Sequence, residues 1–436
     1  MSTSPGRGGA VPAPRPVAGA CQGIEDAAAV ASQARAGELI EIHGRFTATT
    51  QITATGSEAS RAQTAGLRCM AAVRSFANGG AGFAYTTDVS SAGLQWAVAA
   101  ARATRSSAQP PPPPGAKHVD DARWEDSSPA LAQFEEAWTA PGPDSEVVLR
   151  RSRTSVLHVR SDGVHVGYTE GSTSAVVRRG PRAETAWSRD LRPSDLIELV
   201  ERTAATDREQ PWSLLRHPVV FLGGAGAAIT AVIVRALVES PAPVAVDIAA
   251  RLPSQFRILD DGADPDGPAG GPVDAEGWPT AQLVLAEGGE LVIDPTAWGP
   301  PSKVSGPRGR AWRPDLARPP VRTPSNVALV ADLTATEGEA EVRFEDIGRG
   351  LACDSLTFGA LSFDAETAAF AVPCSGRLIR RGELTTRRVR GVLQGTVADL
   401  VAGILEVHPR STFVPLVCGV RAVDVLVAHG VAMRSG

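Results

Sequence analysis

The side chain that most often performs acid-base or metal chemistry is histidine, and the chain has seven. No two of them are four positions apart, and no His-Glu-x-x-His motif is present. A zinc-binding helix needs such spacing, because it places both imidazoles on one face. His158 and His165 flank a predicted hairpin turn, which favours a structural or exposed pair. The other histidines are His43, His118, His217, His408 and His429.

Nucleophile motifs are equally scarce. No Gly-x-Ser-x-Gly turn marks a serine nucleophile. The five cysteines are scattered, form no Cys-x-x-Cys pair and have no protease-like context, which favours reduced thiols. We therefore assign no catalytic residue from motifs, and no residue to substrate binding. The cysteines are Cys21, Cys69, Cys353, Cys374 and Cys418.

Residues 219–234, VVFLGGAGAAITAVIV, raise the question of a nucleotide site. A dinucleotide-binding turn requires Gly-x-Gly-x-x-Gly or Gly-x-Gly-x-x-Ala after a strand. Gly224 and Gly226 fit the first two places, but Ile229 occupies the third. Asp247 imitates the acid that binds a ribose, yet no Gly-Lys-Ser/Thr phosphate loop exists. The pattern favours a tight strand-to-helix turn, with a nucleotide site as the alternative.

An acidic segment at 260–276 offers oxygen ligands for a hard cation. Its spacing is not that of an EF-hand, and Asp-Gly and Asp-Pro pairs are ordinary turn chemistry. A cation site and a set of turns therefore both remain open. The carboxylates are Asp260, Asp261, Asp264, Asp266, Asp274 and Glu276.

Overall charge and hydropathy exclude two classes of partner. The formal net charge is -5, which argues against nucleic acid as a partner. Residues 217–234 carry no charge, but Pro218 and the glycines interrupt the run, so we expect no membrane span. The N-terminus lacks the apolar core of a signal peptide, so we expect a cytoplasmic protein.

The elements that must position these residues divide at five consecutive prolines, Pro110 to Pro114. We predict a disordered leader at 1–20, a small N-terminal α+β domain at 21–108 and a proline-rich linker or loop at 109–130. A larger, antiparallel, β-rich C-terminal domain with a few helices is predicted at 131–436. The fold class is therefore α+β.

Turn residues and hydrophobic periodicity place the individual elements. Asn78-Gly79 and Asp162-Gly163 predict hairpin turns, and Ser90 predicts the N-cap of a helix. In the C-terminal half we predict a strand at 243–250 and a helix at 396–408 among many short strands.

Several segments, taken in order, resemble the TldD/PmbA family, whose PmbA branch is also called TldE and described as a modulator of DNA gyrase. The resemblance covers about residues 22 to 436, and the shared order of the segments is its most specific part. The segments are GGAGFAYTTDVSSAGLQWAVAAARA, VRSDGVHVGYTEGSTSAVVRR, ILDDG, VDAEGWPTAQLVLAEGGEL, GPRGRAWRP, PSNVAL and VLQGTVADLVAGILEV.

In the TldD branch, the segment similar to 219–239 carries His-Glu-x-x-x-His, which binds zinc and activates water. In that stretch this chain has Ala231, Val232 and Arg235, and residues 230–236 contain no His or Glu, so the resemblance implies no zinc ligand and no general base. Cys418 lies near the position of a cysteine ligand in active members, but the surrounding pattern differs.

The resemblance therefore implies a TldE-like, non-catalytic subunit without a cofactor of its own. Its partner would be a TldD-like zinc metallopeptidase subunit, with zinc in the partner. The heterodimer would degrade or process peptides, including leader-peptide removal in the maturation of peptide natural products. The alternatives are a non-enzymatic homodimeric peptide- or ligand-binding protein of the same fold, and an autonomous metallopeptidase with ligands from 260–276.

Overall fold

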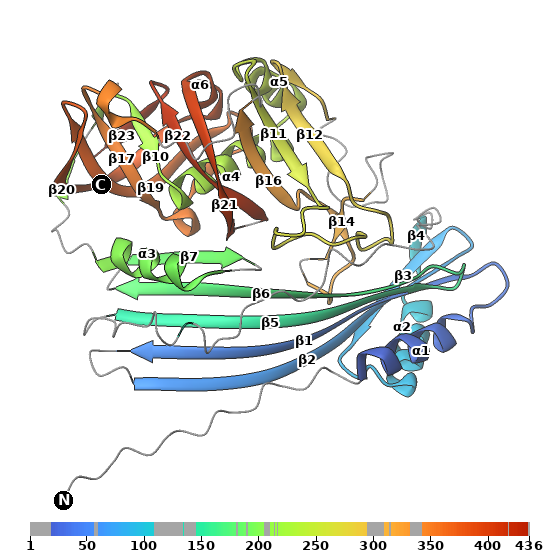
Figure 1. Ribbon diagram of the computed structural model, residues 1–436. Helices are drawn as coiled ribbons and strands as arrows, with labels where there is room; N and C mark the ends of the chain where they lie inside the picture. The colour runs from blue at the N-terminus through green and yellow to red at the C-terminus, as the bar shows by residue number, and fades with distance from the viewer. Residues whose placement is uncertain are drawn as a thin grey trace, which may run out of the picture.

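The computed structural model of the chain describes residues 19–55, 60–108, 134, 145–179, 182–188, 191–204, 210–212, 214–215, 217–293, 309–313, 315–331, 342–416 and 418–434. Of the leader expected at 1–20, residues 1–18 lie outside this range and residues 19 and 20 begin a helix, while the whole proline-rich segment expected at 109–130 lies outside it. In the described part, long strands form one layer and a second body of strands and helices lies beside it (Figure 1). The predicted α+β class is confirmed.

A sheet of long antiparallel strands forms the N-terminal half. Strand β1 pairs along its whole length with β2 on one side and β5 on the other. Strand β6 continues the sheet to β7, while β3 and β4 extend it beyond one end of β2. These pairings join residues before and after the proline-rich segment in one sheet. The strands are β1 (Leu39–Thr55), β2 (Ser60–Ala77), β3 (Gly80–Thr86), β4 (Ser106–Ala108), β5 (Ser145–Arg160), β6 (His165–Arg179) and β7 (Arg182–Ser188).

The two faces of this sheet differ, because successive side chains of a strand point in opposite directions. Ile40 and Ile42 of β1 pack with helices α1 (Gly19–Ala31) and α2 (Ser91–Ala103). Ala54, an even number of positions further, packs with α3 (Pro193–Ala204). The helices therefore cover opposite ends of the same face, which we call the helix face (Figure 1).

Local chemistry fixes the hairpins at the places that the sequence predicted. Asn78 and Gly79 both have positive φ, 52° and 74°, between β2 and β3. Gly163, with a φ of 96°, lies in the turn between β5 and β6. Glycine and asparagine tolerate this left-handed backbone best, which is why such pairs mark tight hairpins. The Ser90 side chain accepts a hydrogen bond from Gly93 N and caps α2.

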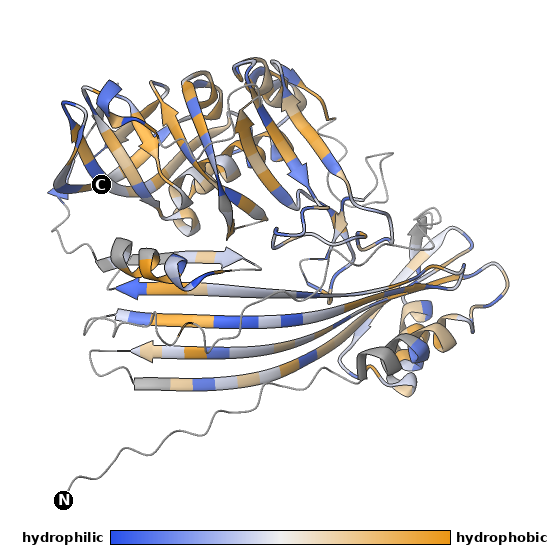
Figure 2. Cartoon of the chain, in the orientation of Figure 1, coloured by the Kyte–Doolittle hydropathy of each residue, from blue (hydrophilic) through white to orange (hydrophobic). Residues whose placement is uncertain are grey.

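The C-terminal half wraps strands around one buried helix, α4 (Gly224–Glu239). Hydrophobic residues, coloured orange, are frequent on the surrounding strands, whereas the middle of the long sheet is mostly pale or blue (Figure 2). The strands are β8 (Gln210–Pro211), β9 (Leu214–Leu215), β10 (Val219–Phe221), β11 (Phe256–Asp261), β12 (Gln282–Glu287), β13 (Glu290–Leu291), β14 (Ala311–Trp312), β15 (Val321–Arg322), β16 (Asn326–Ala331), β17 (Arg349–Leu356), β18 (Ser362–Asp364), β19 (Ala369–Arg380), β20 (Glu383–Thr396), β21 (Ile404–Pro415), β22 (Gly419–Val427) and β23 (Val431–Arg434). Short 3-10 turns lie at Phe344–Asp346 and Phe358–Ala360.

Most strand pairs of this half are antiparallel, as predicted, but three pairs are parallel. These are β10 with β17, β16 with β22, and β20 with β8. Parallel neighbours need a crossover connection, and α4 lies on the one that leaves β10. The C-terminal sheet is therefore mixed.

Two elements differ from the sequence-based expectation. The strand predicted at 243–250 is wrong, because Ala242–Ala250 forms helix α5, which packs on α4, β13 and α6. A short apolar run has no period that separates a buried strand from a buried helix. The helix predicted at 396–408 ends at Ala402: α6 spans Val397–Ala402, and β21 begins at Ile404.

The two halves meet through strand pairing and through two loops. Phe413 of β21 pairs with Trp187 of β7 at the sheet edge. Residues 273–279 and 309–313 pack on the face of the long sheet opposite the helices, which we call the docking face. Among the described residues, no helix is long and apolar enough to cross a bilayer.

Candidate functional site

Helix α4 occupies the place of the expected zinc-binding helix, at the centre of the C-terminal core. It follows β10 through the tight turn that the glycines predicted. Gly223 begins that turn with a φ of 47°, and a Cβ on Gly226 would lie 1.8 Å from the carbonyl oxygen of Val423. Gly226 therefore serves close packing of the helix on β22.

The N-terminus of α4 is already occupied by a carboxylate of the chain. Gly223 N donates a hydrogen bond to Asp424 Oδ1 at 2.7 Å. Asp424 is buried and also pairs with Arg410, whose Nη2 lies 2.7 Å from Oδ2. A helix N-terminus attracts negative charge, and here Asp424 supplies it. The place where a phosphate would bind in a dinucleotide-binding turn is thus filled by Asp424.

The three residues at the expected zinc-ligand places face different surroundings. Ala231 and Val232 are buried in the apolar core, with 6% and 1% of their surfaces exposed. Arg235 lies at the rim, where its Nε is 2.8 Å from Glu239 Oε2 and its guanidinium lies over the ring of Phe363. Alkyl side chains have no donor atom, and a guanidinium stays protonated. These residues do not fit a zinc ion.

Cys418, the other expected neighbour of a zinc site, packs against the same apolar core. Burial, with a contribution from Asp260, raises the pKa of its thiol to about 12. The thiolate is the form that binds metal, so this environment opposes metal binding. The four cysteines whose side chains the structure describes are free thiols.

The acidic segment 260–276 does not form one cluster. Asp260 accepts hydrogen bonds from Ser325 and Asn326 inside the C-terminal half. Asp264 pairs with Arg421, and Asp261 accepts from Ala263 N and Gln282. Among the described residues, no group of three or more His, Cys, Asp or Glu side chains is arranged to hold a metal ion.

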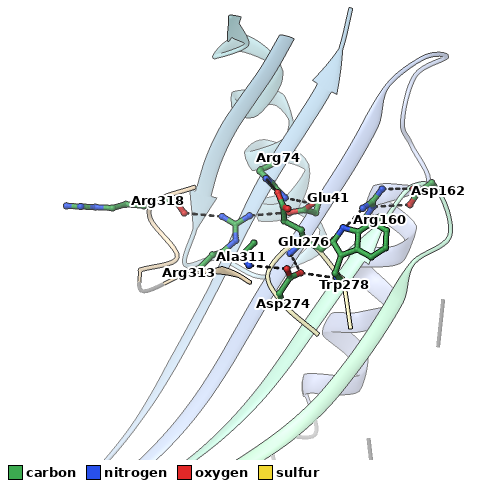
Figure 3. Close-up of polar contacts among 10 residues, drawn as sticks. All are labelled: Glu41, Arg74, Arg160, Asp162, Asp274, Glu276, Trp278, Ala311, Arg313 and Arg318. Atoms are coloured by element: carbon green, nitrogen blue, oxygen red, sulfur yellow. Dashed lines mark hydrogen bonds and ion pairs between the residues drawn. The ribbon is translucent and has the colours of Figure 1, made fainter. Parts of the chain in front are cut away.

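Asp274 and Glu276 instead reach the docking face of the long sheet and enter a buried charge cluster (Figure 3). Arg74 of β2 donates two hydrogen bonds to Glu41 of β1, at 2.8 and 2.6 Å, and one to Glu276 at 3.2 Å. Arg313 approaches Glu41 from the other loop, with Nη2 3.2 Å from Oε1. Each of these four charged side chains is almost fully buried.

Ordinary loop chemistry presents Glu276 to this cluster. Asp274 Oδ1 accepts from Glu276 N and Trp278 N, both at 2.9 Å, and Oδ2 accepts from Ala311 N at 3.0 Å. Gly277 has a φ of 79°, and a Cβ there would lie 2.6 Å from His158 Nε2. The Asp-x-Glu-Gly segment is therefore shaped to fit directly on β5.

The electrostatics of the cluster follow from its burial. Burial raises the pKa of Glu41, but the neighbouring cations Arg74 and Arg313 outweigh it and lower the pKa to about 2. Burial, aided by the negative charge of Glu276, raises the pKa of Asp274 to about 7. Burial and Arg74 lower the pKa of Arg313 to about 9, which leaves it charged at neutral pH.

Two histidines lie beside this cluster, on adjacent strands. His43 of β1 is opposite His158 of β5, with ring centroids 5.8 Å apart, and both are buried. Burial lowers the pKa of both imidazoles, and that of His158 to about 4. His165, on the other side of the hairpin turn from His158, is exposed. The cluster joins the two halves of the chain through buried side chains.

Sequence reasoning missed this cluster as a unit. A partial signal is the alternation in residues 40–45, where Ile40 and Ile42 alternate with Glu41, His43 and Arg45. That pattern predicts a strand with one polar face. It does not show that a loop more than 200 residues away covers the polar face.

Comparisons with known proteins agree with this architecture. Residues 249–428 match the model of the PmbA/TldA metallopeptidase C-terminal domain. No curated protein matches the chain. TldE from Thermococcus kodakarensis is similar in fold, with a TM-score of 0.70 and 17% identity over 91% of this chain and 97% of that one.

Two further solved structures are similar to nearly the full length of the chain. A candidate modulator of a DNA gyrase from Thermotoga maritima MSB8 has a TM-score of 0.69 and 16% identity, over 94% of this chain and 99% of that one. Another from Bacteroides thetaiotaomicron VPI-5482 has a TM-score of 0.63 and 12% identity, over 96% and 98%. Residues 249–428 therefore carry the PmbA/TldA metallopeptidase C-terminal domain, and the chain as a whole shares the fold of these solved structures.

Proposed function

We propose that this chain is a non-catalytic, TldE-like subunit of a two-chain metallopeptidase, whose TldD-like partner carries the zinc. The observation that carries the proposal is the composition of α4: residues 230–236, among them Ala231, Val232 and Arg235, contain neither the two imidazoles nor the carboxylate that a zinc-binding relative needs there. A general base and an open metal position are both required for metal-assisted hydrolysis. Neither can be built from these three side chains.

Two further observations support a role in an assembly. The fold is similar to that of a protein named TldE. The buried charge cluster joins the two halves of the chain through ion pairs of its own side chains, which is consistent with a structural role. We propose that the complex acts in the cytoplasm on short or unfolded peptides, including the leader segments of ribosomally made peptide natural products.

Co-expression with a TldD-like chain from the same genome tests the proposal. We expect the two chains to co-purify, and peptide cleavage to require both chains and to stop in a chelator. Replacing the zinc-binding histidines of the partner should abolish cleavage and leave the complex intact. Cleavage at the same rate without this chain would refute the proposal.

Metal analysis of the purified chain alone provides a second test. We expect less than one equivalent of zinc, because the α4 places lack donor atoms. One equivalent of tightly bound zinc, with peptidase activity lost in a chelator, would instead establish an autonomous metallopeptidase. A stable homodimer that binds peptides but does not bind a TldD-like chain would establish the non-enzymatic alternative.

A further inference from the structure

In the part of the chain that the structure describes, strand β2 has a long edge without a neighbouring strand. It pairs with β1 from Ser60 to Phe76, but β3 covers its other edge only from Ala71 onward. Among the described residues, no strand pairs with the outer edge before Ala71. Every second residue of such an edge presents a free N–H and C=O, which can accept another strand.

The exposed part of this edge lacks the usual protection against strand addition. Residues 62–68, AQTAGLR, are all exposed, and Leu67 exposes 60% of its surface. The segment contains no proline, no lysine and no acidic residue, and Ala62, Ala65 and Gly66 leave the backbone accessible. Proteins normally block open edges with proline, inward charges or bulges, and the β1–β2 pairing here is regular throughout.

Two arginines on the docking face lie beside this edge. Arg68 is opposite Thr47 of β1, and Arg45 lies two residues before Thr47, so both point to the same face. Such diagonal neighbours on adjacent strands are close enough for long side chains to interact. Their surroundings are Met70, Val156 and the hydrogen-bonded hydroxyls of Thr47 and Thr154.

Neither arginine has an ion-pair partner among the described residues, and Arg45 Nε is buried without a hydrogen bond. Two like charges this close repel each other, and a carboxylate between them would remove that repulsion and supply charge-assisted hydrogen bonds. The docking face beside the β2 edge is therefore complementary to an acidic side chain.

We propose that the outer edge of β2 binds an extended acidic peptide, which adds as a strand along residues 62–68 and places a carboxylate between Arg45 and Arg68. Seven residues match a short peptide, whereas a stable interface between folded proteins needs about 20–30 residues a side. The isolated chain should bind the peptide by itself. The statement that such a peptide is a substrate of the complex rests on the proposed function. It specifies that substrate class as extended and acidic.

Fluorescence anisotropy with a labelled heptapeptide of alternating valine and glutamate tests the proposal on the isolated chain. We expect this peptide to bind at least about tenfold more tightly than the same peptide with glutamine, because charge-assisted hydrogen bonds are lost. Binding should weaken as salt rises. In an added strand, every second backbone N–H of the peptide donates a hydrogen bond to β2. Of the two peptides that carry N-methyl groups on alternate amides, one should therefore lose binding and the other should keep it.

The variant Arg68→Glu is expected to weaken binding of the acidic peptide about tenfold. It should also strengthen binding of a peptide of alternating valine and lysine, relative to the parent chain. Arg387→Glu is the matched control, because Arg387 is also an exposed strand arginine, on β20 of the C-terminal half. It should leave the affinity unchanged. Since Arg68 is exposed, its replacement does not disturb the core.

Three outcomes of the peptide experiments would overturn the proposal. The first is no detectable peptide binding at concentrations up to about 1 mM. The second is equal binding of the acidic and glutamine peptides, and the third is an equal effect of the Arg68 and Arg387 variants. Preferential binding of a single-stranded oligonucleotide at the same residues would also refute it. The proposed function is tested separately: co-purification of Arg68→Glu with a TldD-like chain would sustain the complex even if peptide binding at β2 fails.

Discussion

Glu41 illustrates how single charged residues hold the interior of this protein together. Its carboxylate lies between Arg74 and Arg313, and all three side chains are buried. Burial of a charge is costly unless a partner and hydrogen bonds compensate for it. Because each member of the cluster compensates another, the loss of one partner leaves an unpaired buried charge.

Replacing Arg74 by methionine should lower the free energy of unfolding by about 3–5 kcal/mol, because Glu41 and Glu276 lose their shared cation. Urea unfolding followed by tryptophan fluorescence measures the loss. Arg178→Met is the control, because Arg178 pairs with Glu146 on the surface. That pair should contribute about 0–1 kcal/mol. Equal losses in the two variants would contradict the role assigned to the cluster.

The pH dependence of stability should carry a contribution from His158. In the unfolded chain the imidazole takes up a proton near pH 6.5, whereas burial delays this to about pH 4 in the folded protein. The folded state therefore gains stability from neutral His158 above pH 6.5 and loses it as the pH falls towards 4. Asp274 acts in the opposite sense, because its raised pKa gives stability at low pH that is lost as the pH rises through 7.

His158→Asn isolates the histidine contribution. The variant should be destabilised less, relative to the parent protein, at pH 5 than at pH 7.5, because asparagine does not titrate. Urea midpoints at both pH values give the two differences. His165→Asn, which changes an exposed histidine on the same hairpin, should show the same difference at both values. A constant penalty for His158→Asn would rule out this linkage.

At the scale of elements, two glycines near the start of α4, Gly224 and Gly226, differ in how closely the rest of the chain packs against them. Gly226 faces β22 so closely that a Cβ would meet the backbone of Val423, whereas a Cβ on Gly224 would meet nothing within 4 Å. Both positions belonged to the same suspected nucleotide motif. Packing requires glycine at position 226, whereas position 224 has room for a side chain.

Gly226→Ala should therefore lower the free energy of unfolding by about 1–3 kcal/mol, because α4 must move away from β22. Gly224→Ala should leave it unchanged or raise it by up to about 1 kcal/mol, because alanine restricts the unfolded chain. Thermal unfolding of the two variants provides the comparison. If Gly226→Ala were as stable as Gly224→Ala, the close contact with β22 would be refuted.

At the scale of the whole molecule, the match to the C-terminal domain begins after helix α4, which lies at the centre of the C-terminal core. It starts at residue 249, but β10 and α4 at 219–239 contribute many of the core residues that the strands of that region surround. A domain that lacks its central helix leaves a cavity far larger than packing tolerates.

A fragment of residues 249–436 should consequently fail to fold, whereas residues 210–436 should unfold cooperatively. Near-ultraviolet circular dichroism and urea unfolding distinguish the two cases. The longer fragment exposes its side of the charge cluster, so its stability should fall below that of the full chain. A cooperatively folded 249–436 fragment would show that α4 is dispensable.

Much of the architecture could be predicted from local chemistry. Asn78-Gly79 and Asp162-Gly163 determine hairpins through their tolerance of left-handed backbone, and Ser90 caps α2 through its hydroxyl. The α+β class follows from these repeated turns and alternating strands. The strand prediction for 243–250 is wrong because this apolar run has no period that distinguishes a strand from a helix. Ala242–Ala250 forms a helix that packs against α4.

By itself, the sequence determined which side chains the zinc position lacks, because Ala231, Val232 and Arg235 cannot supply donor atoms in any fold. It also determined the polar alternation of β1. Only the tertiary structure decided that Glu41 and His43 are buried and that Glu276 and Arg313 join Arg74. It also decided that, among the described residues, β2 has an open edge beside two arginines without ion-pair partners. The physical reason is distance: turn and capping preferences act over a few residues, whereas charge pairing and burial depend on segments more than 200 positions apart.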